Sequence, residues 1–168
     1  MDTGEIQAAF DDVFDQAILF HGFADYLRDY DVFIYVTADL RTGITPRQLR
    51  YRFVHCVRAA VTSALSPDTW RRSLDERLVD YERGRDLDGF VWGVRWQGLY
   101  PAIRLVADSA EAQRWSGELG LPFREAVIET NGHNISLVFS DLIVQTVDPG
   151  YAPFVVPETG PDFKIHLR

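Results

Sequence analysis

The spacing of hydrophobic positions changes several times along the chain, and each change marks an expected element. Between residues 3 and 20 the apolar residues recur at helical spacing, and Asp2 and Glu5 stand three apart like a capping box that opens a helix. The residues expected to face the core are Ile6, Phe10, Val13, Phe14, Ala17 and Ile18. The pattern therefore predicts a helix over residues 3–20, before Gly22.

Two longer segments alternate with a period of two, which is typical of strands. The first runs from about Ala24 to Ala38. The second covers residues 49–62, where six of seven alternate positions are apolar or aromatic. Thr45 and Pro46 would also suit the start of a helix, but the alternation over residues 49–61 favours a strand.

The central part of the chain predicts two further helices and a strand. Ser66-Pro67 opens a helix that ends at Gly84, and the aromatic row from Phe90 to Trp96 alternates as a strand. Asp108 and Glu111 then box a shorter helix that ends at Gly120. Its buried side is expected to include Trp115 and Leu119.

The clearest local signal is Asn131-Gly132 between two apolar segments. Asn-Gly supplies the two positive φ angles of a type I′ turn, so a hairpin is expected in which Ile128 opposes Ile135. The same register places Ala126 opposite Leu137. A break at Ser140-Asp141 leads into residues 142–147, which gives an expected three-stranded meander.

The order of elements predicts an α+β fold, a mostly antiparallel sheet with about three helices packed on one face. After the last strand, prolines recur at every fourth position, and neither a helix nor a central strand tolerates that spacing. They are Pro149, Pro153, Pro157 and Pro161. We therefore expect one domain over residues 1–148 and an extended, proline-containing arm over residues 149–168.

Charge is distributed unevenly along this fold. The first forty residues contain nine acids and one base, Arg28, which accounts for the whole net charge of −8. If the strands at 24–38 and 49–62 pair antiparallel, acids and arginines lie across from one another on a solvent-facing side. The acids are Asp25, Asp29 and Asp31, and the arginines are Arg50, Arg52 and Arg58.

A second group of acids has no such partners in the sequence. Asp11, Asp12 and Asp15 fall on the polar side of the first predicted helix, and Glu5 lies nearby. We expect these four residues to form an exposed negative surface that binds a cationic protein.

Composition excludes several other classes of protein. A pI near 4.9 argues against sequence-independent binding of nucleic acid, which needs a cationic surface. No apolar run approaches the roughly 20 residues that span a bilayer, so no membrane association is expected. The single Cys56 and the acidic start of the chain suit a reducing cytoplasm.

Catalytic chemistry has weaker support. His55 and His133 with Asn134 could contribute to a ligand site, and Trp92 and Trp96 could stack a sugar or a base. A hydrogen-bonded core imidazole, an exposed turn histidine and a core aromatic row explain the same residues more simply. No histidine has a ligand at metal-binding spacing and no glycine-rich phosphate loop is present, so neither a metal nor a cofactor is expected.

Three stretches resemble a bacterial family, the YxiG-like domain proteins. They are residues 20–23 with 28–30, residues 73–77 through 88–94, and residues 129–135 with 138–142. The likeness runs over about residues 5–147. Some similar proteins are encoded near secreted toxins, so the resemblance implies an immunity role or another protein-binding role, and it supplies no catalytic residues.

The sequence thus favours a non-catalytic interaction protein, and an immunity protein that binds a basic toxin domain is one form of this hypothesis. Two rival hypotheses stay open. One is an enzyme or small-ligand binder with a site around His55 and His133. The other is a structural homo-oligomer in which the C-terminal arm adds a strand to a neighbouring copy.

Overall fold

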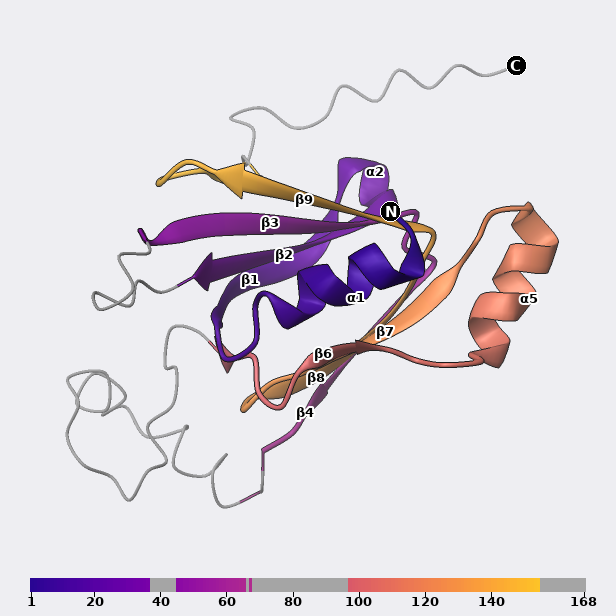
Figure 1. Cartoon of the computed structure of the whole chain (residues 1–168), viewed down its shortest axis with the longest axis horizontal. Coiled ribbons are helices and arrows are strands. Elements are labelled where there is room, and N and C mark those ends of the chain that lie inside the picture. Colours follow the sequence, from indigo (N-terminus) through magenta and orange to yellow (C-terminus); the bar gives the residue numbers. More distant parts are fainter. Residues whose placement is uncertain (37–44, 66, 68–96, 155–168) are drawn as a thin grey trace, which may run out of the picture.

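The computed structural model describes residues 1–36, 45–65, 67 and 97–154, and these residues form two antiparallel sheets with three helical segments. Sheet A lies above sheet B in the view of Figure 1. In order across sheet A, the strands are β5 (Gln97–Gly98), β1 (Ala17–Ala24), β2 (Asp29–Val36), β3 (Arg47–Val54) and β9 (Asp141–Val147). Sheet B contains β4 (Arg58–Ser63), β8 (His133–Phe139), β7 (Arg124–Glu129) and β6 (Ile103–Leu105). The helices are α1 (Thr3–Asp11), α2 (Asp25–Arg28) and α5 (Ala110–Leu119). The α+β class is confirmed.

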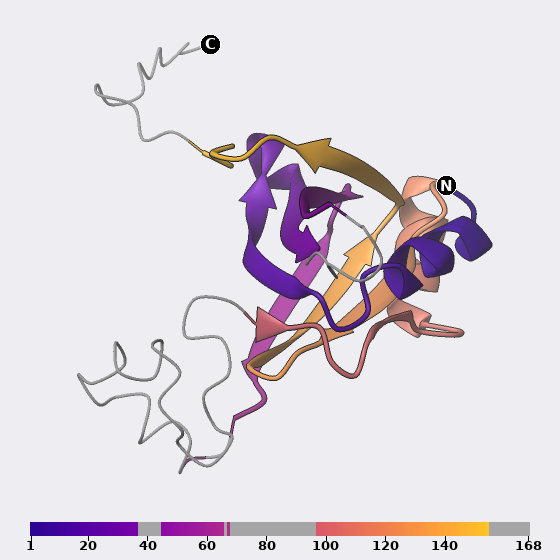
Figure 2. The same ribbon diagram turned by 60° about the vertical axis from the view of Figure 1, so that its left-hand side comes forward.

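The main hydrophobic core lies where the inner faces of the two sheets meet α1. Phe53 of sheet A packs edge-on against Phe139 of sheet B with 4.8 Å between ring centroids, and it also contacts Phe10 of α1. Ile6 of α1 is fully buried in the same cluster. Figures 1 and 2 show α1 beside both sheets, so one apolar helix face seals the core along that side.

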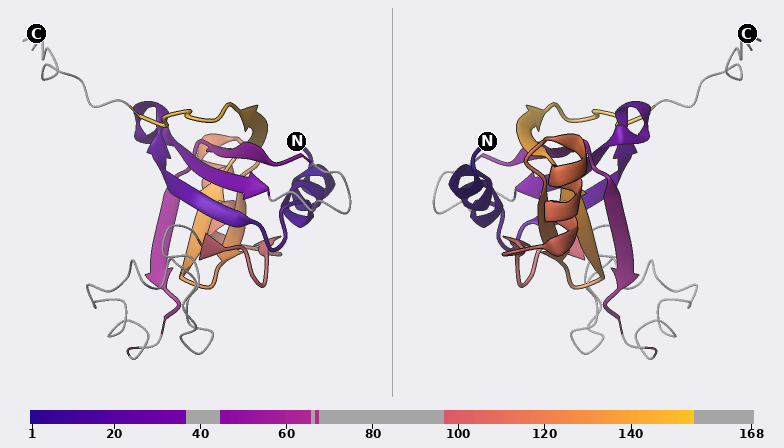
Figure 3. Two further views of the ribbon diagram at one scale, coloured as in Figure 1. Left: turned by 90° about the vertical axis from the view of Figure 1, so that its left-hand side faces the viewer. Right: turned by 90° about the vertical axis from the view of Figure 1, so that its right-hand side faces the viewer.

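The second helix layer is α5, which covers the opposite, outer face of sheet B. Ala112 and Trp115 of α5 pack against Phe123 and Val138. The right-hand view of Figure 3 shows α5 in front of β7 and β8. The expectation for Leu119 was wrong, because 52% of this residue is exposed at the helix end.

The first helix is shorter than the sequence pattern predicts. The capping box is confirmed, with Asp2 accepting from the Glu5 N–H at 2.8 Å and Glu5 accepting from the Asp2 N–H at 2.7 Å. The helix ends at Asp11, however, and residues 17–24 form β1 because they pair with β2. Asp15 makes the turn between them with a φ of 59°, a conformation that Asp tolerates better than most residues.

The two long predicted strands are also subdivided. The strand expected over residues 24–38 begins only at Asp29, because residues 25–28 form the turn that joins β1 to β2. The segment at 49–62 is extended, as expected, but it divides into β3 and β4 at His55. His55 has a φ of 49°, and this bend carries the chain from sheet A into sheet B.

The hairpin around Asn131 has the predicted register but a different turn. Ile128 opposes Ile135 and Ala126 opposes Leu137, as expected. Neither Asn131 nor Gly132 has a positive φ, so the expected type I′ turn is wrong. Thr130 closes the turn instead, because its Oγ1 accepts from the N–H of Gly132 at 3.0 Å and from that of His133 at 2.7 Å.

Two other expectations need correction. The expected three-stranded meander is wrong, because the chain leaves sheet B at Ser140. The next strand, β9, pairs with β3 of sheet A along its whole length. The N-cap of α5 is Ser109 rather than Asp108, while its C-terminal end at a left-handed Gly120 is confirmed. The helix from Ser66-Pro67, the strand at 90–96 and residues 155–168 of the expected arm lie outside the described residues.

Candidate functional site

The acids and arginines of β2 and β3 meet in a buried ionic cluster on the outer side of sheet A. Asp31 lies opposite Arg52 in the register, and its carboxylate accepts from Arg52 Nε at 3.0 Å. Arg50 donates to the same carboxylate from Nη2 at 2.7 Å and from Nε at 2.9 Å. The predicted cross-strand pairing of Asp31 with Arg50 and Arg52 is therefore confirmed.

The cluster does not face solvent, contrary to expectation. Asp31 is only 1% exposed. The segment after β9 lies over this face, with the Tyr151 ring 5.6 Å from that of Phe33 and 5.9 Å from the guanidinium of Arg50. Burial raises the pKa of the Asp31 carboxyl, and the charge of Arg50 offsets part of that effect.

Asp29 joins β2 to the bend at His55. Its carboxylate accepts from the backbone N–H of His55 at 2.9 Å and from Nε of Arg28 at 3.3 Å. Asp29 is buried, whereas the side chain of Asp25 is outside the described part of the structure. The acids of β2 thus stabilise the fold rather than offer a surface to a partner.

Arg58 has different partners from those expected. It forms ion pairs with Glu125 and with Glu111, the latter at 2.8 Å, beneath α5. Ser109 and Ser136 also donate to the Glu125 carboxylate. Burial would raise the pKa of Glu125, but these hydrogen bonds and the charge of Arg58 outweigh it and hold that pKa below its usual value.

The surroundings of His55 suit a structural role better than a catalytic one. Its Nδ1 lies 2.8 Å from Oγ of Ser140, which in turn donates to the Val54 carbonyl at 3.2 Å. A Ser-His-Asp relay would need the carboxylate on the imidazole. Here Asp29 contacts the backbone N–H of His55 instead. Next to it, burial raises the pKa of the Cys56 thiol to about 12, so this thiol is a poor nucleophile.

The second predicted histidine lies at the other end of β8. His133 Nδ1 is 2.6 Å from Nε2 of Gln97, so it ties the hairpin to β5. Ser140, the partner of His55, directly follows the last residue of β8, whereas His133 is the first. The two ends of a seven-residue strand are roughly 20 Å apart. The structure therefore does not bring His55 and His133 together.

Of the remaining members of that alternative site, only Asn134 lies in the described part of the chain. Asn134 is half-buried within β8, opposite Glu129. Trp92 and Trp96 lie outside the described residues. Burial, together with the charge of His133, lowers the pKa of His21.

The acids of the N-terminal region do reach the surface. Glu5 is exposed but is committed to the capping box. Asp11, Asp12 and Asp15 are also exposed, and Asp11 accepts from Gln7 Nε2 at 2.9 Å. Within the described chain, no Lys or Arg forms an ion pair with any of these three carboxylates.

Two aromatic rings that were not predicted to belong to a site lie beside these acids. Phe14 is 52% exposed and Tyr100 is 61% exposed, and their ring centroids are 6.1 Å apart. Backbone bonds fix the pair, since Asp15 donates to the Leu99 carbonyl and Leu99 donates to the Gln16 carbonyl. Phe14 was expected in the core, and the early end of α1 is the reason that it lies outside.

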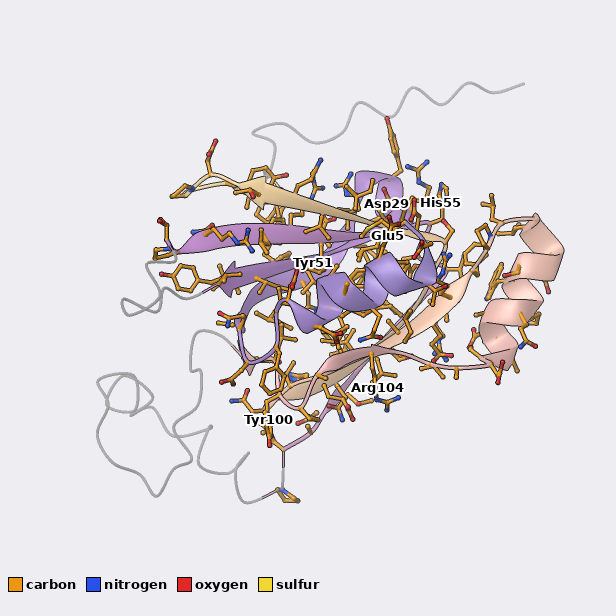
Figure 4. All side chains as sticks on the ribbon, viewed as in Figure 1. Glu5, Asp29, Tyr51, His55, Tyr100 and Arg104 are labelled. Carbon is orange, nitrogen blue, oxygen red and sulfur yellow. The ribbon has the colours of Figure 1, made fainter. Side chains whose placement is uncertain are left out.

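We call this region the acidic–aromatic surface, and its members are Asp11, Asp12, Phe14, Asp15 and Tyr100. It lies at the C-terminal end of α1. Figure 4 shows Glu5 toward the opposite end of that helix from Tyr100. Glu5 is thus separate from the three unpaired aspartates with which it was grouped.

Other kinds of site receive no support from the described residues. Among them, no three His, Cys, Asp or Glu side chains are grouped so that they could hold a metal ion. None of the helices in these residues has the length and apolar character needed to cross a bilayer.

Two antiparallel sheets with α1 and α5, together with the acidic–aromatic surface, define a small α+β protein with a mixed charged and aromatic face. Its sequence matches the family model described as YxiG-like protein over residues 2–157, and the chain belongs to this family. No curated protein and no solved structure matches the chain.

Proposed function

We propose that this protein binds a cationic protein partner through the acidic–aromatic surface and catalyses no reaction. The observation that supports this proposal is the exposure of Phe14 and Tyr100 beside three carboxylates that lack a basic partner in the described chain. Aromatic side chains are enriched at the centres of protein interfaces, where they act as anchors. The surrounding charges would select the partner.

The partner class that suits this surface is a basic toxin domain, with the protein acting as its immunity protein in the cytoplasm. Complementary charge raises the rate of association and suppresses binding to wrong partners. Both properties suit an inhibitor that must capture a toxin quickly. The one cysteine, buried as a thiol, suits a reducing compartment.

The first experiment changes the charge of the surface. After crosslinking in the native host identifies a partner, both proteins are purified and binding is followed by surface plasmon resonance. We expect the triple variant Asp11→Asn, Asp12→Asn, Asp15→Asn to lower the association rate at low salt by roughly tenfold.

The matched control changes the same amount of charge elsewhere. It combines Asp108→Asn, Glu118→Gln and Asp148→Asn, three exposed acids that do not belong to the acidic–aromatic surface. This control should leave the association rate within about twofold of wild type. Equal rates for the two triple variants would contradict the proposal.

A second pair of variants tests the aromatic anchors. Phe14→Ala with Tyr100→Ala should weaken binding by roughly thirtyfold, mainly through faster dissociation, because buried anchors dominate interface energetics. Leu119→Ala removes an equally exposed apolar side chain on α5 and should have no effect. The proposal fails if the double variant binds as tightly as the Leu119→Ala variant.

A further inference from the structure

The turn at the tip of the β1–β2 hairpin opposes the conformational preference of its residues. Tyr26 has φ 61° and ψ 21°, and Leu27 has φ 59° and ψ 25°. Two consecutive positive φ angles define the type I′ class of turn, which strongly favours Asn and Gly. Bulky side chains are strained there because Cβ approaches the following carbonyl oxygen.

Packing within the described chain does not explain why Tyr and Leu occupy this turn. Tyr26 is 98% exposed and Leu27 is 77% exposed. At Gly120, where φ is 67°, the same conformation is taken by a glycine. The tip therefore combines backbone strain with two large side chains in water, and strain of this kind persists mainly at functional positions.

The base of the tip is held firmly. Ala24 pairs with Asp29, and the Phe23 ring packs edge-on against Tyr30 with 5.1 Å between centroids. The Tyr30 hydroxyl is 2.7 Å from His21 Nδ1. A tip on so rigid a hairpin loses little conformational entropy when it binds, so it is preorganised as a ligand.

We propose that Tyr26 and Leu27 insert together into an apolar pocket of a protein partner, a second interaction site beyond the proposed function. The pocket would have a neutral or acidic rim, because the exposed guanidinium beside the tip belongs to Arg28, the only base in the first forty residues. A hydrogen-bond acceptor inside it would satisfy the Tyr26 hydroxyl.

A protein pocket fits this tip better than a lipid surface. Stable attachment to a membrane needs either a larger apolar face or several basic residues. The tip offers two apolar side chains, and its one base, Arg28, is offset in the sequence by Asp25, on a chain with a net charge of −8 that anionic lipids repel.

The tip is also distinct from the acidic–aromatic surface. The two sites lie at opposite ends of β1. This strand has eight residues, so its ends are roughly 20 Å apart. The left-hand view of Figure 3 shows α2, which contains the tip, on the opposite side of the molecule from α1.

A stability measurement tests the strain. The double variant Tyr26→Asn, Leu27→Gly, which we call the relaxed-turn variant, should lower the equilibrium constant for unfolding in urea by roughly tenfold or more. The reason is that the turn is relieved and no packing is lost. The pair Tyr26→Phe, Leu27→Met, which we call the conservative variant, should leave that constant unchanged. A relaxed-turn variant no more stable than wild type would overturn the proposal.

A binding measurement tests the pocket. A photoreactive amino acid at position 27 is used in the native host, with the same group at the exposed Gln145 of β9 as the control. A protein adduct should form from position 27 only. Once purified, that protein should bind the wild type at least thirtyfold more tightly than the relaxed-turn variant. The conservative variant, which lacks the Tyr26 hydroxyl, should bind with an affinity between the two.

Three results would overturn the proposal. One is the lack of a protein adduct specific to position 27. Another is equal affinity of the purified partner for wild type and the relaxed-turn variant. The third is sedimentation of the chain with phosphatidylglycerol vesicles that is lost in the relaxed-turn variant, because the tip would then bind lipid.

Discussion

The ionic cluster of Asp31, Arg50 and Arg52 shows how a carboxylate with almost no access to water can be retained in a small fold. Both oxygens of Asp31 accept from guanidinium groups, and the three side chains come from adjacent strands. Charges that are removed from water need this degree of satisfaction, because each would otherwise carry a large desolvation penalty. The cost of breaking the cluster should therefore exceed that of breaking an exposed ion pair.

We expect Asp31→Asn to lower the free energy of unfolding by roughly 3–5 kcal/mol, since it removes the carboxylate that two buried guanidinium groups share, although Arg52 also lies 3.9 Å from the Asp29 carboxylate. Denaturation in urea, followed by tryptophan fluorescence, measures the change. The control is Glu118→Gln, which breaks the exposed pair between Glu118 and Arg114 and should cost less than about 0.5 kcal/mol. Similar losses in both variants would contradict this account of the cluster.

Among the elements, the β7–β8 turn has a role beyond reversing the chain. Thr130 is buried, and its hydroxyl accepts from two backbone N–H groups and lies 2.8 Å from Gln97 Oε1. Gly98 and Asn131 exchange two further hydrogen bonds. A Cβ on Gly132 would come within 2.9 Å of the Gln97 side chain, which would have to shift away from its partners Thr130 and His133. The turn thus fastens β5 of sheet A to the hairpin of sheet B.

We expect Thr130→Val to destabilise the protein by about 1–3 kcal/mol, because two buried N–H groups lose their acceptor while the volume of the side chain is kept. Thr130→Ser retains the hydroxyl and should cost less than about 1 kcal/mol. Thermal or urea unfolding of the two variants provides the comparison. If Ser and Val destabilise the protein equally, the hydroxyl is not what holds the turn.

The elements also show which features the sequence could predict. Alternating patterns identified β2 and β3, because each strand buries alternate residues. The Asn131-Gly132 signal located the β7–β8 turn and its register, although the turn is not of type I′. The bend at His55 has no glycine or proline to mark it, so β3 and β4 appear as one strand. Likewise, the pairing of β9 with β3 depends on contacts between residues almost one hundred positions apart, which local patterns do not encode.

The candidate sites were also predictable only in part. The exposure of Asp11, Asp12 and Asp15 was predicted from helical periodicity, although α1 ends at Asp11 and Asp15 lies in the turn that follows. The exposure of Phe14 was not predicted, because it depends on where α1 ends and on the pairing of residues 15–16 with Leu99. The strained Tyr26 and Leu27 were hidden inside a pattern that resembles a continuing strand.

The reactivity of the Cys56 thiol can show whether the core of the whole molecule is closed. Cys56 is buried in the core cluster at the crossing from β3 to β4, and its Sγ donates to the Arg58 carbonyl at 3.1 Å. A reagent can reach this thiol only when the packing around it opens. The single cysteine of the chain is therefore a probe of opening at the crossing between the sheets.

Because burial raises the pKa of Cys56 to about 12, alkylation by iodoacetamide at pH 8 should be slower in the folded protein than in the urea-unfolded chain. The thiolate fraction alone predicts a difference of roughly three orders of magnitude. As a control, Gln145→Cys in a Cys56→Ser background places the thiol on exposed β9 and should react at nearly the unfolded rate. Rapid labelling of native Cys56 would contradict its burial between the sheets.

The crossing of the chain between the sheets has a consequence for the timing of folding during synthesis. Sheet A starts with β1 at residue 17 and receives its last strand, β9, at residues 141–147, after all the strands of sheet B. On the ribosome, β3 must therefore wait with one edge unpaired while roughly ninety further residues are translated. At about 5–20 residues per second, that wait lasts several seconds. The native fold is thus completed near the end of translation, and the emerging chain exposes an open sheet edge to chaperones until then.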